Sequence, residues 1–442
     1  MVIARRTWAS AVGLLLLSEL LWAQGQKVII LENADSLVGR VVDGQTAREL
    51  IGNVRFSQEN VRVSCDRALQ YIESGEVVLS GHVTVIEDSL TMTSARGVYH
   101  RDERRAEAFD EVRLDDGTVQ LTAGYGEYQV GPRQALFRRR VVVRDTASTI
   151  RSDSLRYFRD DKHSVAMGHV VVYNRTDDVT ITGHHLEHWT PSQFSRMTED
   201  PVLMKLERTE GGRSDTLVVQ SLIMEAHRDS VGRLVAVDSV RFVRSDIAGK
   251  AGAAIFYTQH DSILLRGNPL LWYRETQVSG DSINIYLVRR KLNLVSVMGS
   301  ALAISRSDSL FPGRYDQLAG ESMRMHFADR ALAKLDVRTR ARSVYYVYED
   351  SAANGLNTSS GDRVLIAFAE GRVKSISVVG GVEGQYVPEN LVRDHHQEYA
   401  LPGFIWREDR PRISPADIPG FYTIQAGHGS DKQHTGSAQP AR

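Results

Sequence analysis

The stretch GHVTVIEDSLTMTSARGVYH, residues 81–100, contains the pattern that decides the fold. Apolar residues stand two apart in Val83-Thr84-Val85 and again in Leu90-Thr91-Met92, and Asp88-Ser89 separates the two runs. A period of two is typical of β-strands with one buried face, and Asp and Ser favour turns. The stretch therefore predicts antiparallel strands joined by a tight turn.

The same pattern recurs at a fixed interval along the N-terminal half of the chain. The differences 83−54, 112−83, 141−112 and 170−141 all equal 29, and they separate the valines that begin five similar runs: Val54, Val83, Val112, Val141 and Val170. A third signal ends in a tyrosine in four of the five repeats, at Tyr71, Tyr99, Tyr128 and Tyr157, with steps of 28, 29 and 29 residues, and the fifth repeat has Leu186 to His188 instead. Repeated strand units that each bury one face predict stacking around a continuous apolar interior.

Residues that favour turns stand two positions before the repeated valines. Three of these are glycines, Gly52, Gly81 and Gly168, and the other two are Asp110 and Arg139. We expect turns at these positions, so that each repeat contains three or four short strands and no helix.

The parity of the strands predicts which side chains share the apolar face. They are the alternate apolar residues of the two runs in each repeat: Val83, Val85, Leu90, Met92, Val112, Leu114, Val119, Leu121, Val141, Val143, Val170, Val172, Val179 and Ile181. Apolar parity in strands is ordinarily core packing, so a sealed interior and an accessible groove both fit this pattern.

Composition excludes several classes of protein. The 442 residues carry 54 Lys and Arg against 55 Asp and Glu, a net charge of −1 that argues against nucleic-acid binding. The single cysteine, Cys65, permits no intramolecular disulfide and no Cys/His zinc site. Arg5 and Arg6 precede the apolar run from Trp8 to Leu17, which predicts a signal peptide over residues 1–23 and an exported protein.

The sequence predicts two consecutive lobes and a tail. The regular repeats define a lobe over residues 24–195. A divergent second lobe is expected over 198–392, where Asn268-Pro269-Leu270 resembles Asp200-Pro201-Val202. The tail, 393–442, ends in a stretch rich in Gly, Ser, Gln and His, and we expect it to be partly disordered.

The repeat resembles the OstA-like N-terminal domain family. The resemblance rests on Gly81-His82-Val83-Thr84-Val85, Ser152-Asp153-Ser154-Leu155-Arg156-Tyr157, Ala166-Met167-Gly168-His169-Val170 and Gly183-His184-His185-Leu186. It is good over residues 27–192 and weak over 198–392. The resemblance implies an all-β fold of stacked antiparallel strands in a half-open β-jellyroll, a β-taco, whose apolar interior shields lipid acyl chains.

The resemblance also implies a function and partners. It points to a periplasmic carrier or bridge that moves lipopolysaccharide or a related glycolipid to the outer membrane, and outer-membrane association fits that role. An open jellyroll exposes strand edges, so we expect edge-to-edge docking on other envelope transport components. The fourteen apolar candidates would line the lipid groove, and no catalytic group or cofactor is needed.

The sequence also fits other interpretations. His184 and His188 are expected on one face and His185 on the other, which disfavours a metal site. The basic runs Arg138–Arg140 and Arg101–Arg105 suit solvated turns or contacts with lipid phosphate. A structural or adhesive repeat protein with a sealed core is one alternative. A β-helical polysaccharide-degrading enzyme is another, although its coils usually repeat at about 20 to 25 residues.

Overall fold

The computed structural model describes residues 29–413, except 59, 177, 209–213, 229–231, 258, 289–290, 308–310, 329–330, 350–351, 371 and 394. The predicted signal peptide and residues 414–442 of the tail lie outside this range. The described residues form antiparallel strands almost throughout, with one short α-helix and one 3-10 helix. None of their helices is long and apolar enough to cross a membrane.

The chain divides into two compact units. Unit 1 comprises the residues up to Pro201 and Leu222–Val235, and unit 2 comprises Val202–Ser221 and the residues from Ala236 onward. The all-β, half-open jellyroll that the sequence predicts is confirmed. The domain limits 24–195 and 198–392 stay a prediction.

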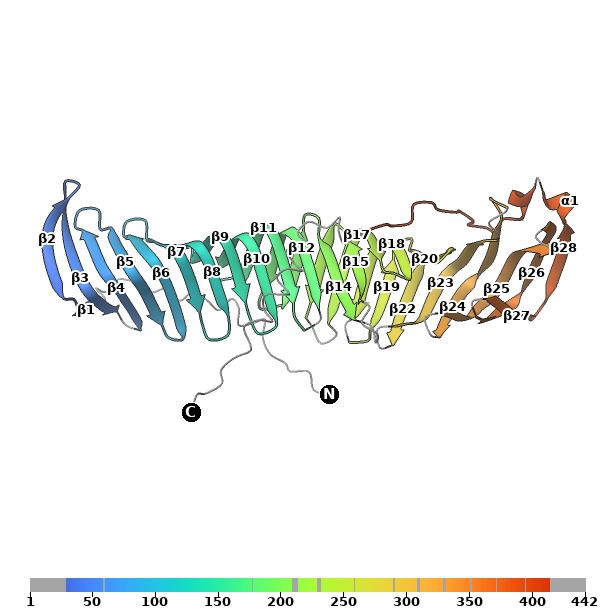
Figure 1. Cartoon of the computed structure of the whole chain (residues 1–442), viewed down its shortest axis with the longest axis horizontal. Helices are drawn as coiled ribbons and strands as arrows, with labels where there is room; N and C mark the ends of the chain where they lie inside the picture. Colours follow the sequence, from blue (N-terminus) through green and yellow to red (C-terminus); the bar gives the residue numbers. More distant parts are fainter. Residues whose placement is uncertain are drawn as a thin grey trace, which may run out of the picture. The chain divides into compact units, whose positions relative to one another are not determined.

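Unit 1 consists of antiparallel strands that pair with one another mostly in chain order (Figure 1). Its strands are β1 (Ile30–Asn33), β2 (Ser36–Val42), β3 (Gln45–Gln58), β4 (Val61–Tyr71), β5 (Val77–Glu87), β6 (Leu90–His100), β7 (Arg105–Asp115), β8 (Gln120–Gln129), β9 (Gln134–Arg144), β10 (Ser148–Phe158), β11 (His163–Asn174), β12 (Val179–Trp189), β13 (Phe194–Thr198) and β16 (Ile223–His227).

Five of these strands, the odd-numbered strands from β3 to β11, bend once near the middle, at a corner of two residues with positive φ. The corners of the odd-numbered strands β3 to β11 are the pairs Gly52-Asn53, Gly81-His82, Asp110-Glu111, Arg139-Arg140 and Gly168-His169. At each corner the register shifts and the strand then continues, as between Ser80 and Val83 in β5. The expectation of turns between short strands at these positions is therefore wrong, because the corners lie within single strands of about eleven residues.

The packing at the corners explains why the first corner residue is glycine in some repeats and a larger residue in others. A Cβ on Gly81, at φ +75°, would lie 2.2 Å from Oδ2 of Asp66, which fills that space from β4. The Asp66 carboxylate also contacts the corner through Nδ1 of His82 at 2.8 Å. Where Arg139 forms the corner, the neighbouring strand carries Gly124 instead. One small residue and one larger residue thus meet at each of these corners.

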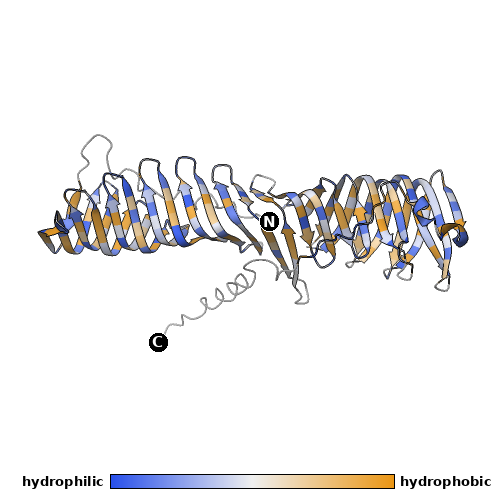
Figure 2. Cartoon of the chain, turned by 90° about the horizontal axis from the view of Figure 1, so that it is seen from above, coloured by the Kyte–Doolittle hydropathy of each residue, from blue (hydrophilic) through white to orange (hydrophobic). Residues whose placement is uncertain are grey.

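The corners divide the strands of unit 1 into two layers. Layer A contains the strand halves that end at the turns near residues 88–89, 116–118 and 145–147, and layer B those that end near 101–104, 130–133 and 159–162. Leu114 and Leu121 of layer A share a buried cluster with Phe137 and Tyr157 of layer B, so the core lies between the layers. Figure 2 shows the alternation of apolar and polar residues along the strands.

Unit 2 repeats this construction with strands of more varied length, from 4 residues in its shortest strands to 19 in its longest. Its elements are β14 (Val202–Arg208), β15 (Ser214–Gln220), β17 (Arg233–Val243, in unit 2 from Ala236), β18 (Ile247–Tyr257), β19 (Ser262–Arg266), β20 (Leu270–Tyr273), β21 (Thr276–Ser279), β22 (Ser282–Val288), β23 (Lys291–Arg306), β24 (Tyr315–Ala328), β25 (Ala331–Glu349), β26 (Ala352–Ala369), β27 (Arg372–Val379), β28 (Glu383–Pro388), α1 (Glu389–Val392) and the 3-10 helix η1 (His396–Tyr399). Corners recur at Gly267-Asn268, Gly299-Ser300 and Gly380-Gly381.

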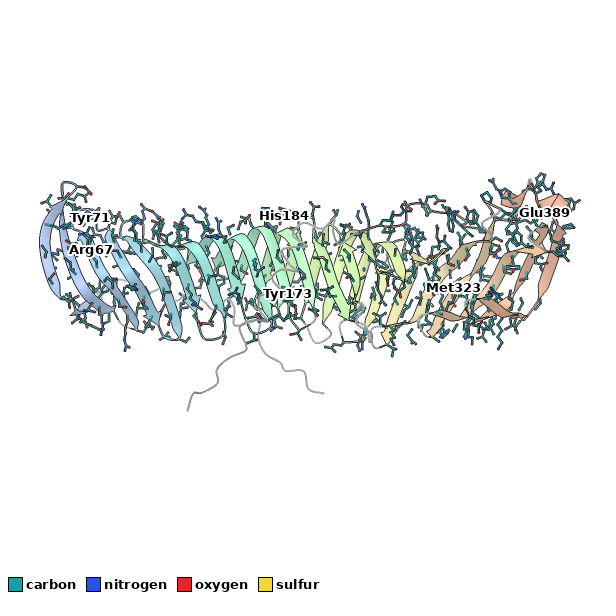
Figure 3. All side chains as sticks on the ribbon, in the orientation of Figure 1. Arg67, Tyr71, Tyr173, His184, Met323 and Glu389 are labelled. Atoms are coloured by element: carbon teal, nitrogen blue, oxygen red, sulfur yellow. The ribbon has the colours of Figure 1, made fainter. Side chains whose placement is uncertain are left out.

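The inner face of unit 2 is filled by large aliphatic side chains. Ile283, Ile285, Val295, Val297 and Met323 are each 0% exposed; Figure 3 labels Met323. Beyond η1, residues 401–413 form neither strand nor helix and run back along the unit (Figure 1). We call residues 401–413 the strap.

Candidate functional site

The inner face of layer A in unit 1 carries an uninterrupted row of apolar side chains that face one another across neighbouring strands. We call this row the apolar ladder: Phe56, Val63, Val85, Met92, Leu114, Leu121, Val143, Ile150, Val172 and Ile181. Cross-strand apolar pairs stabilise a sheet, and a row that spans ten strands also presents a continuous hydrocarbon surface. A surface of this kind is suited to an extended apolar ligand.

Burial along layer A depends on the distance from the corners. The valines directly after the corners, Val83, Val112, Val141 and Val170, are each 1% exposed. Two residues further on, the apolar ladder includes buried members such as Leu114 and half-buried members such as Val143 and Val172. The inner face is thus densely packed at the corners and partly accessible farther away.

The structure places all fourteen predicted apolar candidates on this one face of layer A. One buried cluster contains Leu90, Val112, Leu114, Val119, Leu121 and Val141, and Met92 and Val143 pack against it. Val83 and Val85 belong to two neighbouring clusters. Val172 and Ile181 are half-buried and pair with each other across β11 and β12. Their role in binding stays a prediction.

The opposing wall of the site lies in layer B. The sequence did not lead us to predict it, although the regular spacing of the tyrosines indicated it. A second row of facing residues alternates large rings with small side chains: Tyr99, Ala106, Tyr128, Ala135, Tyr157, Ser164, His188 and Ser195. Burial raises the pKa of Tyr157 to about 12. Tyr71 is not in this row, because the 28-residue step puts Gln70 opposite Val77 in its place.

His188 is the titratable side chain in this wall whose pKa falls. It is 6% exposed, and its Nδ1 lies 2.9 Å from Oγ of Ser195. Burial, and secondarily the charge of Arg228, lowers the pKa of His188 from 6.5 to about 4. His188 is therefore neutral at physiological pH, which suits its buried position.

The other two histidines of the run lie apart from His188, and the expectation that His184 and His188 share a face is wrong. The corner opposite β12 interrupts the alternation, so His184 is exposed near the corner residue His169 (Figure 3). His185 bonds Glu187 at 3.3 Å on the outer face. Among the described residues, no group of three His, Cys, Asp or Glu is placed to hold a metal ion.

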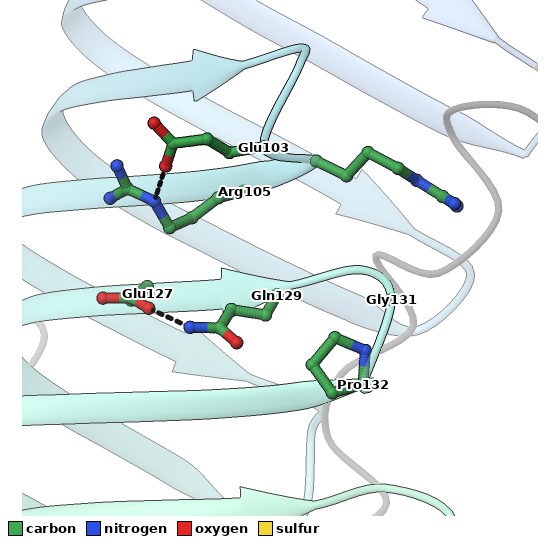
Figure 4. A pocket seen from close by; sticks show the side chains of 7 residues that line it. Glu103, Arg105, Glu127, Gln129, Gly131 and Pro132 are labelled. Carbon is green, nitrogen blue, oxygen red and sulfur yellow. Dashed lines mark hydrogen bonds and ion pairs between the residues drawn. The ribbon is translucent and has the colours of Figure 1, made fainter.

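The outer face of layer B carries a polar pocket of about 470 Å³ between two turns (Figure 4). Its lining includes Glu103, Arg105, Glu127 and Gln129. Nε of Arg105 donates to Glu103 at 2.7 Å, and Nε2 of Gln129 donates to Glu127 at 2.8 Å. Arg105 of the basic run 101–105 is thus paired with acids, which weakens that run as a phosphate site.

Comparison with known families agrees with this architecture. Residues 26–117 and residues 73–166 each match the model of the family described as OstA-like protein. Residues 26–166 are OstA-like. Two overlapping matches are what a repeat gives, because the family pattern aligns with more than one set of strands. The OstA-like region contains ladder residues from Phe56 to Ile150 and ends within β11.

One solved structure similar to the chain is described as LptH, the LptA homologous periplasmic component of the conserved lipopolysaccharide transport device from Pseudomonas aeruginosa. The two sequences are 12% identical, the match covers 32% of this chain and 95% of LptH, and the TM-score is 0.25. No curated protein matches the chain.

Proposed function

We propose that the protein is a periplasmic lipid-shielding carrier or bridge, which moves lipopolysaccharide or a related glycolipid toward the outer membrane. The observation that carries the proposal is the apolar ladder, with half-buried members such as Val143 and Val172, in a unit whose residues 26–166 are OstA-like. Acyl chains insert between layers A and B, and the polar headgroup stays in water. The protein acts passively, without catalysis, and a partner supplies the energy.

Acyl chains are costly to expose to water. Each methylene left in water costs roughly 0.8 kcal/mol, so a lipid with several chains crosses an aqueous compartment slowly unless it is shielded. A ladder of valine, leucine and isoleucine offers the same apolar environment at each strand. A chain can therefore move along it without large steps in free energy.

The ends of the chain support docking on other envelope components with a similar edge. At the N-terminal end, β1 and β2 each pair with β3, and Ile30 and Val41 are exposed by 57% and 72%. At the C-terminal end, β27 and β28 each pair with β26, and Ile376 is 48% exposed. Unpaired strand edges with exposed apolar side chains favour strand addition.

Strand direction suits an antiparallel junction. Along β1 and β2 the chain runs from layer A to layer B of unit 1. Along β27 and β28 it runs first past residues 363–369 of β26 and then past residues 355–360, toward the start of that strand. The last strands of one molecule and the first strands of the next can therefore pair in antiparallel order.

Photocrosslinking in living cells tests the lipid groove. A photoreactive residue replaces Val85, Leu114, Val143 or Val172 on the inner face, and Arg113 on the outer face is the matched control. The proposal predicts glycolipid adducts at the inner positions, most at half-buried Val143 and Val172, and none at Arg113. A folded, exported protein that captures no lipid at any position would contradict it and favour the sealed structural protein.

A further inference from the structure

The strap covers the outer face of unit 2, and it is held by contacts of a kind that recognise extended peptides. Nε2 of Gln277 donates to the carbonyl of Arg407 at 2.6 Å, and the amide of Arg407 donates back to Oε1 of Gln277 at 3.1 Å. The amide of Leu401 donates to Oε1 of Gln317 at 2.8 Å. The two glutamines are only 1% and 5% exposed, so the main chain of the strap satisfies buried amides.

Apolar side chains of the strap fill the space between these bonds. Leu401, Phe404 and Trp406 pack on a cluster of Leu302, Ile304 and Ala319. The Tyr315 ring lies 5.5 Å from the Phe404 ring and 4.7 Å from the Trp406 ring. Aromatic anchors in pockets are typical of peptide recognition, where a few large side chains supply most of the affinity.

Charges and one apolar residue fix the direction of the strap. Asp409 pairs with Lys250 at 2.6 Å, and Glu408 pairs with Arg306 at 3.3 Å. Arg410 donates to the carbonyl of Arg274 at 2.8 Å. Ile413 then packs against Val202, Met204 and Val218. A reversed strap would place its acids and its arginine against the wrong partners.

The segment before the strap is anchored separately. Arg314 forms a two-bond ion pair with Glu389 of α1, at 2.6 and 3.0 Å, and the two side chains are 8% and 15% exposed. The Arg314 guanidinium also lies over the rings of Phe311 and Tyr346. Between this anchor and the first aromatic contact, Gly403 adopts φ +86°. A rotation at Gly403 therefore allows residues 404–413 of the strap to detach while α1 stays in place together with Leu401, which packs on the cluster that contains Val392.

We propose that the outer face of unit 2 is a binding groove for an extended peptide, that the strap is its separable ligand, and that the strap of a second copy binds the same groove. The bonds described between strap and unit 2 involve side chains, so exchange between copies breaks no strand pairing. A second copy supplies the same glutamine, aromatic and charge contacts, and swapping an identical segment is a low-cost route to association. This inference is independent of the lipid groove.

Cleavage of the full-length chain tests separability. A protease recognition sequence inserted directly after Arg393 allows the strap to be cut from an otherwise intact protein. We expect the cut strap to co-elute with the body and then to exchange with a fluorescein-labelled synthetic peptide of residues 395–413. Failure of the peptide to bind, while circular dichroism shows that the cut protein stays folded, would overturn the proposal.

Two substitutions test the contacts. Gln277→Ala in the body and Trp406→Ala in the peptide should each weaken peptide binding at least tenfold, since one removes both backbone bonds and the other removes the main anchor. Gln129→Ala, in unit 1, is the matched control and should leave binding unchanged. The peptide variant cannot affect folding of the body, so unaltered binding of that variant would by itself contradict the groove.

Isotope mixing tests the second copy. Uncut protein with a photoreactive residue at position 404 is prepared in ¹⁴N and ¹⁵N forms, which are mixed and irradiated. Exchange predicts crosslinks between position 404 of one isotope and the β23 peptide of the other, in increasing yield with protein concentration. Crosslinks confined to a single isotope at every concentration would overturn the exchange.

Discussion

Unit 1 and unit 2 share their corners and an apolar inner face, but in unit 2 the outer face around β23 is apolar as well. Three positions after the corner glycine, β5 of unit 1 carries the polar Thr84, and β23 of unit 2 carries Leu302. In unit 1 the inner wall is partly accessible at Val143, whereas in unit 2 Val278 is 0% exposed. In unit 2 the outer face is apolar and the strap covers it.

The side chains on the two faces of the strands, and not the backbone fold, therefore decide what a unit can bind. The same corner supports an accessible inner wall in unit 1 and a sealed inner wall with an outer peptide groove in unit 2.

An outer-face substitution should cost little unfolding free energy in unit 1 and much more in unit 2. Leu114→Ala should cost about 3 kcal/mol of unfolding free energy, and its outer neighbour Arg113→Ala less than about 0.5 kcal/mol. In unit 2, Leu302→Ala on the outer face should cost about 2 to 3 kcal/mol, because the strap buries it. Urea unfolding measures all three, and a neutral Leu302→Ala would break the comparison.

The two units should respond to acid in opposite directions. The pKa of His188 is lowered from 6.5 to about 4. Unit 1 therefore has its full unfolding free energy from this group above pH 6.5, and it loses about 3 kcal/mol of that free energy as the pH falls from 6.5 to about 4. Burial raises the pKa of Asp316 from 3.8 to about 6, so unit 2 gains up to about 3 kcal/mol as pH falls from 6 toward 3.8.

Urea unfolding at pH 7 and pH 4.5 measures this effect. Fluorescence of Trp189 reports on unit 1 and that of Trp272 on unit 2, in variants that keep only one of these two and have the other three of the five tryptophans replaced. His188→Gln should flatten the response of unit 1, and Asp316→Asn that of unit 2. Equal shifts in both units, unchanged by these variants, would contradict the burial of the two groups.

Substitution at a corner should cost less than loss of a core residue. Gly81→Ala should destabilise unit 1 by about 2 kcal/mol, because it combines a left-handed backbone with a clash against Asp66. The double variant Gly81→Ala/Asp66→Ala should recover part of the lost stability. One repeat later the corner residue is the larger Asp110, and Ala95 occupies the position equivalent to Asp66. Thermal unfolding of the single and double variants measures the recovery; its absence would refute the pairing.

The smallest predicted effect compares equivalent valines of the inner walls. Val143→Ala in unit 1 should cost roughly 0.5 to 1 kcal/mol, and Val278→Ala in unit 2 about 2 kcal/mol, because only Val278 is fully removed from water. Chemical denaturation of both variants gives the difference. Equal costs would mean that the wall of unit 1 is as sealed as that of unit 2.

The sequence predicts the inner face of unit 1 well, because strand parity is a local property and the repeat displays it several times. The corners were misjudged, since Gly81 looks like a turn between strands, and only the register shows that β5 continues beyond it. Parity does not carry across a corner, which is why His184 and His188 separate. The strap could not be predicted, because the bond between Gln277 and Arg407 joins residues 130 positions apart.

The most direct test of the account is to locate a bound acyl chain in both units at once. Purified full-length protein is irradiated with lipopolysaccharide that carries a diazirine on an acyl chain, and mass spectrometry maps the adducts. The account predicts adducts on the apolar ladder of unit 1, chiefly near Val143, Val172 and Ile181, and none on the inner wall of unit 2 around Ile283 and Val297. Adducts distributed equally over both inner walls, or confined to outer-face residues such as Arg113, would contradict it.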